Sequence, residues 1–145
     1  MITCTRRLEW DAMHRVPGHE GKCKAFHGHR YVAEITCRAP DDQLDDVGRV
    51  VDFGVIKARV GQFIDDRWDH TAILWSEDED PAVKAIAESN AAHGRPVYWL
   101  AKPPTAEYIA EELGRVAGVC LQGTGVEVVS VRVYETPNCR ADWQP

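Results

Sequence analysis

Apolar and polar residues alternate strictly along one segment of the chain, residues 27–38. Side chains of a β-strand point to opposite faces with a period of two, so this pattern predicts a strand with one buried face. The residues assigned to that face are His27, His29, Tyr31, Ala33, Ile35 and Cys37. Strand-like patterns also occur in residues 2–10, 49–53 and 126–136. A shorter strand-like pattern covers residues 97–100.

Apolar residues at helical spacing predict two main helices. Asp52 is placed to cap the first, which runs to about Trp68, and Thr105 is placed to cap the second, which runs from Ala106 to about Ala117.

A third, shorter helix is expected at about residues 80–94. It begins with Asp80 as cap and Pro81 at the first helical position, and Gly94 follows its end. The predicted fold is α+β: one antiparallel, four-stranded sheet with two main helices on one face. We expect a single domain over residues 1–145, with the short helix as an insertion.

Composition narrows the class of protein. The chain has 145 residues, a net charge of −6 and five cysteines. An acidic chain is a poor general binder of nucleic acid or anionic membrane, and no apolar run or leader indicates insertion or secretion. The odd cysteine count favours a reducing, cytoplasmic compartment. Arg15, Lys22 and Lys24 nevertheless make one loop locally basic, which suits an anionic ligand.

Two histidines on the buried face indicate a metal site. His27 and His29 follow Cys23 by four and six positions, and buried imidazoles need partners for their lone pairs. The candidates for a third ligand are His14, His19, His70, His93 and Cys23. We favour His14, because pairing of the first two strands would return it to His27. Three histidines leave the fourth position of a tetrahedral Zn²⁺ open, as in catalytic sites. A structural site that includes Cys23, and a histidine pair without metal, remain alternatives.

Two glutamates, and an aspartate next to a histidine in the sequence, are further candidates for active-site residues. Glu135 ends a row of valines (129, 131 and 133) on one strand face, so it should meet a protein arginine or the paired donors of a ligand. Asp69 can orient His70 and stabilise its charged form, although a surface pair is the more common explanation of two such residues. Glu107 lies in the first turn of a helix, where the helix dipole alone favours a carboxylate.

These residues together carry a resemblance to a known family. The chain has Cys23-x3-His27-Gly28-His29, preceded by an aromatic-x-Ala-x-His element that ends at His14. Further landmarks follow in order: Val51-Asp52-Phe53, Trp68-Asp69-His70, Pro104-Thr105-Ala106-Glu107 and Val133-Tyr134-Glu135-Thr136. Over nearly its whole length the chain resembles the 6-pyruvoyl-tetrahydropterin synthase superfamily, whose bacterial branch includes the 6-carboxy-tetrahydropterin synthases of the queuosine pathway. Met13 and Phe26 depart from the usual residues at their positions.

The resemblance implies a fold and an assembly. It is the tunnelling fold, in which subunits join their sheets into a closed barrel as a trimer, and two trimers stack into a hexamer. Active sites then lie between subunits, so Asp69 and His70 serve a neighbour's site.

The resemblance also implies residue roles. His14, His27 and His29 hold Zn²⁺, Cys23 is the base, and His70 with Asp69 relays a second proton. Glu135 anchors the pterin, with Glu107 and Thr105 close to it.

The expected activity is that of a zinc-dependent lyase. It converts 7,8-dihydroneopterin triphosphate to 6-carboxy-5,6,7,8-tetrahydropterin and releases acetaldehyde and triphosphate. The compact chain and the retained Cys23 favour this branch. One alternative is the pyruvoyl branch, which eliminates triphosphate without loss of carbon; another is a non-catalytic module that binds zinc and a pterin.

Overall fold

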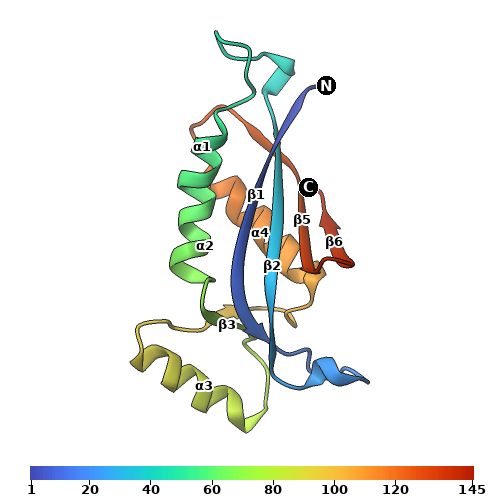
Figure 1. The fold of residues 1–145 in the computed structure, drawn as a ribbon, viewed down its shortest axis with the longest axis vertical. Coiled ribbons are helices and arrows are strands. Elements are labelled where there is room, and N and C mark those ends of the chain that lie inside the picture. The colour runs from blue at the N-terminus through green and yellow to red at the C-terminus, as the bar shows by residue number, and fades with distance from the viewer.

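Two long antiparallel strands, β1 (Thr3–His14) and β2 (His27–Arg38), form the centre of the computed structural model, which describes residues 1–145 (Figure 1). Their register runs from the pair Thr3–Arg38 to the pair His14–His27. Alternate side chains are buried along both strands, as the pattern predicts for residues 27–38. The register places the last residue of β1 beside the first residue of β2.

The sheet has six strands in the order β4-β3-β1-β2-β5-β6. The other four strands are β3 (Thr71–Trp75), β4 (Tyr98–Leu100), β5 (Glu127–Thr136) and β6 (Cys139–Trp143). β3 runs parallel to both β1 and β4, and all other neighbours are antiparallel. The expected four-stranded antiparallel sheet is therefore wrong in both strand number and direction.

Residues 49–53 do not form the expected strand. The amide of Arg49 donates to the carboxylate of Asp45 at 2.8 Å, and the carbonyl of Arg49 accepts from the amide of Asp45 at 2.8 Å. This local turn satisfies the polar groups that a strand would offer to a neighbour. A strand forms instead at the apolar residues 72–75, which belong to β3. It is buried on both faces because Val83 and Val97 pack against Ala72 and Leu74.

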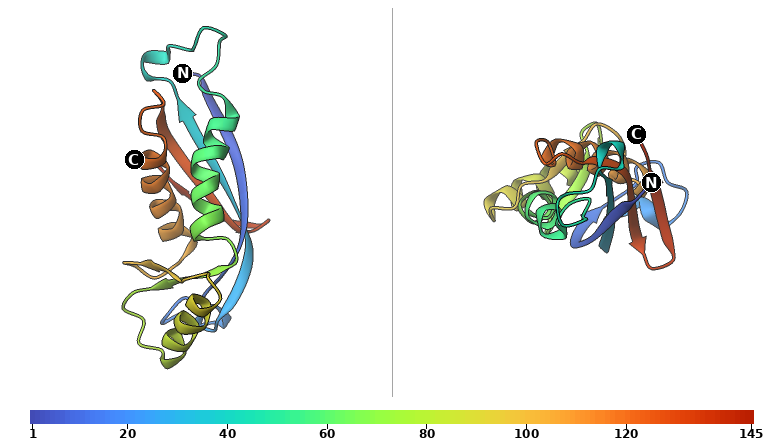
Figure 2. Two further views of the ribbon diagram at one scale, coloured as in Figure 1. Left: turned by 90° about the vertical axis from the view of Figure 1, so that its left-hand side faces the viewer. Right: turned by 90° about the horizontal axis from the view of Figure 1, so that it is seen from above.

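Helices cover one face of the sheet (Figure 2). One continuous helix comprises α1 (Phe53–Ile56), a π-helical segment (Lys57–Gly61) and α2 (Gln62–Arg67); α4 (Ala106–Cys120) lies beside it. The expected caps are present, since the side chains of Asp52 and Thr105 accept hydrogen bonds from the first turns of α1 and α4. None of the helices combines the length and apolar character needed to cross a membrane.

The segment expected to be an insertion carries α3 (Pro81–Ala92), which the side chain of Asp80 caps. α3 lies at the same end of the molecule as the connection between β1 and β2 (Figure 1). That connection contains a short 3₁₀ turn, Lys22–Lys24, and a second one, Pro40–Asp42, follows β2.

A bulge in β5 changes which valines face the core. Thr36 pairs with Ser130, but the next residue of β2, Cys37, pairs with Val128. Val129 is therefore an extra residue, and Val128 packs against the core in its place. The expected position of Val129 on the inner face is wrong, whereas Val131 and Val133 are buried as expected.

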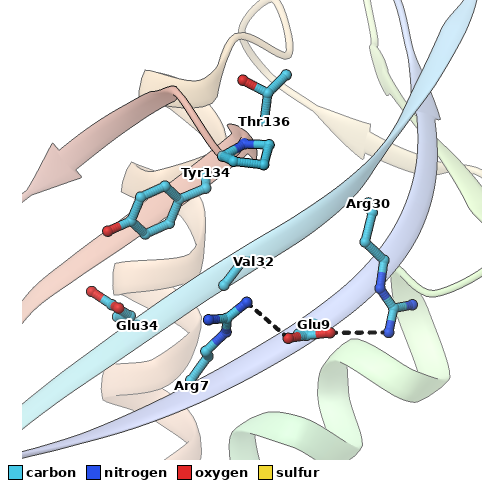
Figure 3. Close-up of a pocket in the computed structure, with 8 residues that line it drawn as sticks. Arg7, Glu9, Arg30, Val32, Glu34, Tyr134 and Thr136 are labelled. Atoms are coloured by element: carbon cyan, nitrogen blue, oxygen red, sulfur yellow. Dashed lines mark hydrogen bonds and ion pairs between the residues drawn. The ribbon is translucent and has the colours of Figure 1, made fainter.

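The opposite face of the sheet carries no helix and is rich in charge (Figure 2). Glu9 pairs with Arg7 at 3.0 Å and with Arg30 at 3.1 Å, and Arg30 also pairs with Asp11 at 2.8 Å. The side chains of Arg7, Glu9 and Arg30, together with Tyr134, border a hollow of about 400 Å³ (Figure 3). We call this side the outer face.

Candidate metal centre and active site

Three histidines converge at the end of the β1–β2 hairpin. His14 is buried, at 1% exposure, and His27 and His29 are half-buried on the same side of the sheet. Their ring centroids lie 4.6 to 5.0 Å apart, and one nitrogen of each ring lies within 4.8 Å of the other two. The structure thus brings together the three residues that the sequence analysis selects.

Backbone carbonyls determine which nitrogens carry hydrogen. His14 Nδ1 lies 2.7 Å from the carbonyl of Pro104, and His27 Nδ1 lies 2.7 Å from the carbonyl of Ala25. A carbonyl only accepts, so both Nδ1 atoms are protonated and both Nε2 atoms of the neutral rings present lone pairs. Burial lowers the pKa of His14 to about 4, reinforced by the neighbouring His27 and His29, so its ring is neutral at pH 7.

These lone pairs face one another without a proton between them. The Nε2 atoms of His14 and His27 are 3.1 Å apart, and His29 Nε2 is buried with no hydrogen-bond partner. A tetrahedral Zn²⁺ with nitrogen ligands about 2.0 Å away spaces those nitrogens about 3.3 Å apart. Carbonyl groups behind two of the rings are the usual support of metal-bound histidine. The three imidazoles therefore fit a divalent ion such as Zn²⁺.

The other candidate ligands lie outside this group. The ring of His19 accepts from the amide of Gly21 at 2.8 Å, and the ring of His93 pairs with the carbonyl of Ser89 at 2.8 Å. The sulfur of Cys23 is not among the atoms within 4.8 Å of the histidine nitrogens. Without Cys23 in the ligand set, the geometry favours a three-histidine site over a structural site with a thiolate.

Glu135 borders the histidines from the end of β5. Its Oε1 lies 3.7 Å from His14 Nε2, and its side chain is 22% exposed. Burial raises the pKa of Glu135, the charge of Glu107 adds to this effect, and His27 opposes it. No arginine pairs with Glu135, so the carboxylate is free for a ligand with paired donors.

The start of α4 forms another wall of the site. The carbonyl of Pro104 accepts from His14, and the hydroxyl of Thr105 accepts from the amide of Tyr108 at 3.4 Å. Glu107 is exposed, and its charge acts on Glu135. Thr105 thus has a capping role here, and Glu107 lies within electrostatic reach of the centre.

Cys23 lies in the turn between the two metal-ligand strands. Its carbonyl accepts from the amide of Val16 at 2.8 Å, and its side chain is half-buried. Its charge contributes to the raised pKa of Tyr31, after burial and Glu135. Tyr31 in turn packs edge-on against His14 and His29.

Tyr31 is a site residue that the sequence analysis left unassigned. Its ring stacks on Trp10 with centroids 5.2 Å apart, and its hydroxyl is buried without a hydrogen-bond partner. The alternation along residues 27–38 already places Tyr31 on the same face as His27 and His29, so the sequence pattern was sufficient to predict that Tyr31 lies beside the histidines.

Asp69 and His70 form a separate cluster. His70 Nδ1 lies 2.7 Å from the carboxylate of Asp69, a contact that residues adjacent in a regular strand rarely make. It forms because His70 precedes β3 with a φ of +57°, while the amide of Asp11 donates to Asp69 at 2.9 Å.

This cluster faces the outer side of the sheet. His70 is 72% exposed, and it borders a shallow hollow with Gly28 and Arg30, which are exposed residues of β2. Of the three histidines of the centre, His29 also borders this hollow, whereas His14, His27 and Cys23 do not.

Comparisons with known proteins agree with this architecture. The profile of the family described as 6-pyruvoyl tetrahydropterin synthase matches residues 3–145. A protein of Rickettsia bellii named 6-carboxy-5,6,7,8-tetrahydropterin synthase is 43% identical over 141 residues, which cover 96% of this chain and 97% of that protein. A Halobacterium salinarum protein named probable 6-carboxy-5,6,7,8-tetrahydropterin synthase is 41% identical over 132 residues, covering 91% of this chain and 79% of that one.

Solved structures share the fold at lower identity. An uncharacterized protein from Wolinella succinogenes aligns with a TM-score of 0.80 and 22% identity, over 99% of this chain and 97% of that one. The 6-pyruvoyl tetrahydropterin synthase of Caenorhabditis elegans aligns with a TM-score of 0.69 and 19% identity, over 99% and 95% of the two chains.

Proposed function

The chain belongs to the 6-pyruvoyl tetrahydropterin synthase family, and on this premise we propose that it is a zinc-dependent lyase. Its substrates are 7,8-dihydroneopterin triphosphate and one water molecule, and its products are 6-carboxy-5,6,7,8-tetrahydropterin, acetaldehyde and triphosphate. The observation that carries the proposal is the set of three converging imidazoles beside Glu135: the Nε2 of His29 has no hydrogen-bond partner, and no arginine or lysine pairs with Glu135. The near full-length relatives named 6-carboxy-5,6,7,8-tetrahydropterin synthase favour this branch.

The three histidines would hold the ion through the unprotonated nitrogens of their rings. His14 and His27 keep their Nε2 lone pairs directed inward because their Nδ1 atoms donate to carbonyls, and His29 contributes a nitrogen that has no other partner. A Zn²⁺ ion bound here supplies Lewis acidity to the hydroxyl groups of the substrate side chain.

Glu135 orients the pterin. A pterin ring presents an N–H and an exocyclic amine side by side, and one carboxylate accepts from both. Glu135 lies next to the histidine centre without a protein cation to occupy it, so ring recognition there positions the side chain of the substrate beside the histidines. Glu107 and Thr105 complete the wall on the α4 side.

Cys23 and the Asp69–His70 pair move protons. Cys23 Sγ takes a proton from the carbon of the substrate side chain and returns it. His70 Nε2 exchanges the second proton, and Asp69 holds the opposite nitrogen at 2.7 Å. Because His70 borders the outer face, whereas the imidazoles of its own chain lie on the inner face of the sheet, it serves the centre of an adjacent subunit in a homo-oligomer.

Product analysis tests the function. Zinc-loaded protein is incubated with 7,8-dihydroneopterin triphosphate, and acetaldehyde, 6-carboxy-tetrahydropterin and triphosphate are quantified; we expect all three in equal amounts. The Cys23→Ala variant should retain zinc and lose turnover. Formation of 6-pyruvoyl-tetrahydropterin without acetaldehyde would assign the pyruvoyl reaction instead, and binding of the pterin without any product would assign a non-catalytic module.

A further inference from the structure

Arg15 makes a two-pronged ion pair with a carboxylate 63 residues away. Its Nε and Nη2 donate to the two oxygens of Asp78 at 2.7 and 2.8 Å. The side chain of Asp78 is 2% exposed and that of Arg15 is 16% exposed, so the pair is shielded from water. Parallel N–H···O bonds of this kind fix the relative orientation of the two groups.

The same guanidinium reaches two further partners. Its Nη1 donates to the carbonyl of Lys24 at 3.0 Å and lies 3.2 Å from the carboxylate of Asp80. Its flat face covers the ring of Phe26, 5.4 Å from the centroid. Arg15 therefore joins the 76–100 segment to both ends of the loop between β1 and β2, which lie at the same end of the molecule (Figure 1).

Each anchored point adjoins a residue of the proposed active site. Arg15 directly follows His14, Lys24 directly follows Cys23, and Phe26 directly precedes His27. Arg15 is thus not free for an anionic ligand, in contrast to what the basic character of the loop suggests, because two carboxylates neutralise it.

We propose that Arg15 is a positioning residue that holds Cys23 in register with the histidine centre, and that Asp78 keeps Arg15 in place from the inserted segment. The inference deepens the proposed function, because it assumes Cys23 to be the base. The backbone of Cys23 is tied on one side by Val16 and on the other by the contact of Arg15 with Lys24. Loss of Asp78 leaves a shielded guanidinium without its fork partner, which releases the loop that carries the thiol.

Three variants test the proposal. Asp78→Asn removes the charge but keeps the shape, Arg15→Lys keeps the charge but loses the fork, and Glu79→Gln is a matched control that removes an exposed neighbouring charge with no ion pair. For each variant the zinc content, the melting temperature, kcat and KM are measured. The rate at which iodoacetamide alkylates Cys23 is followed by peptide mass mapping, which separates this thiol from the other four cysteines.

The expected result has three parts. Asp78→Asn and Arg15→Lys retain zinc, lose at least about tenfold in kcat with KM changed less than threefold, and show faster alkylation of the half-buried Cys23. Glu79→Gln matches the wild type in every measurement.

Other outcomes overturn the inference. Unchanged kcat and unchanged alkylation in both variants would show that the pair does not position Cys23. Loss of zinc in proportion to kcat would assign the pair to metal retention instead. If the wild type does not turn over the substrate, the proposed function fails on its own, and the alkylation rates still decide whether the pair holds the thiol.

Discussion

The Nε2 atoms of His14 and His27 lie 3.1 Å apart, although the other nitrogen of each ring already donates to a backbone carbonyl. Two lone pairs at this distance repel each other, and His14 is too buried to take up a second proton at neutral pH. The arrangement is stable when a cation lies between the rings.

Removal of one imidazole should therefore abolish metal binding. We expect about one zinc per wild-type chain and almost none in His27→Ala, because two nitrogens hold the ion far more weakly than three. Elemental analysis of protein purified without chelator measures this. His93→Ala is the control, since its ring contacts only the carbonyl of Ser89; equal zinc in His27→Ala and wild type would contradict the site.

The placement of His70 on the outer face predicts complementation between subunits. Cys23→Ala and His70→Ala are each expected to be inactive, but oligomers co-expressed from both should regain about a quarter of wild-type activity, from sites that combine the intact residue of each chain. A mixture of Cys23→Ala with His14→Ala should stay inactive, because those two residues belong to the same chain's site. Absence of recovery in the first mixture would place His70 in its own chain's site.

Gly114 and Gly118 of α4 should respond to alanine in opposite ways. A Cβ on Gly114 would clash with the ring of Trp143, whereas a Cβ on Gly118 meets nothing within 4 Å. Gly114→Ala should lower the free energy of unfolding by about 1–2 kcal/mol, since the clash outweighs the gain in helix propensity. Gly118→Ala should raise it by about 0.5–1 kcal/mol. Urea denaturation of both variants measures the difference, and equal effects would contradict the packing of α4 on β6.

Tyr31 and Tyr98 should differ in their response to loss of the hydroxyl. The hydroxyl of Tyr31 is buried without a partner, while that of Tyr98 donates to Glu112 at 2.5 Å. Tyr31→Phe should leave the free energy of unfolding unchanged or raise it by up to about 1 kcal/mol, and Tyr98→Phe should lower it by about 1.5–3 kcal/mol. A comparable loss in Tyr31→Phe, measured on zinc-free protein by urea denaturation, would show that the Tyr31 hydroxyl has a partner.

The ion pair of Asp78 should give stability that depends on pH. Hydrogen bonds from Arg15 hold the pKa of Asp78 below its usual value, against the opposing effect of burial. A carboxyl group whose pKa is lower in the folded state stabilises the fold above its unfolded pKa of about 4, and this contribution is lost as the pH falls through the folded pKa.

The comparison between wild type and Asp78→Asn isolates this effect. We expect a wild-type advantage of about 2 kcal/mol that is constant between pH 7 and 5 and shrinks below pH 4. Urea denaturation at each pH, with EDTA present in both samples, removes any contribution from zinc. A difference that persists unchanged at pH 3 would exclude the charge of Asp78 as its source.

Local patterns predicted the parts of the fold that depend on neighbours in the sequence. The strand His27–Arg38 matches residue for residue because alternation alone defines it, and Asp52 and Asp80 cap helices as expected because capping is a contact between close residues. Residues 49–53 have strand-like character, but the turn with Asp45 satisfies the amide and the carbonyl of Arg49 instead of a neighbouring strand.

Long-range arrangements were not predictable from those patterns. β3 is buried on both faces and pairs in parallel with β1 through only Ala12 and Met13, and β6 is short and polar at its start. The contact of Arg15 with Asp78 joins two segments that are 63 residues apart, and no pattern in either segment predicts that it lies against the other. His14 was accessible to reasoning because strand pairing requires it to return to His27.

All three imidazoles belong to a single hairpin, and this has a consequence for the order of events during synthesis. The ligand set is complete on the nascent chain once β2 has left the ribosome, long before Pro104 and Glu135 are translated. At that stage the carbonyl of Ala25 is already present to hold the ring of His27, whereas the ring of His14 is still free to rotate and change tautomer. The carbonyl of Pro104 fixes the ring of His14 only later, so the second half of the chain completes the rigid arrangement of the three imidazoles.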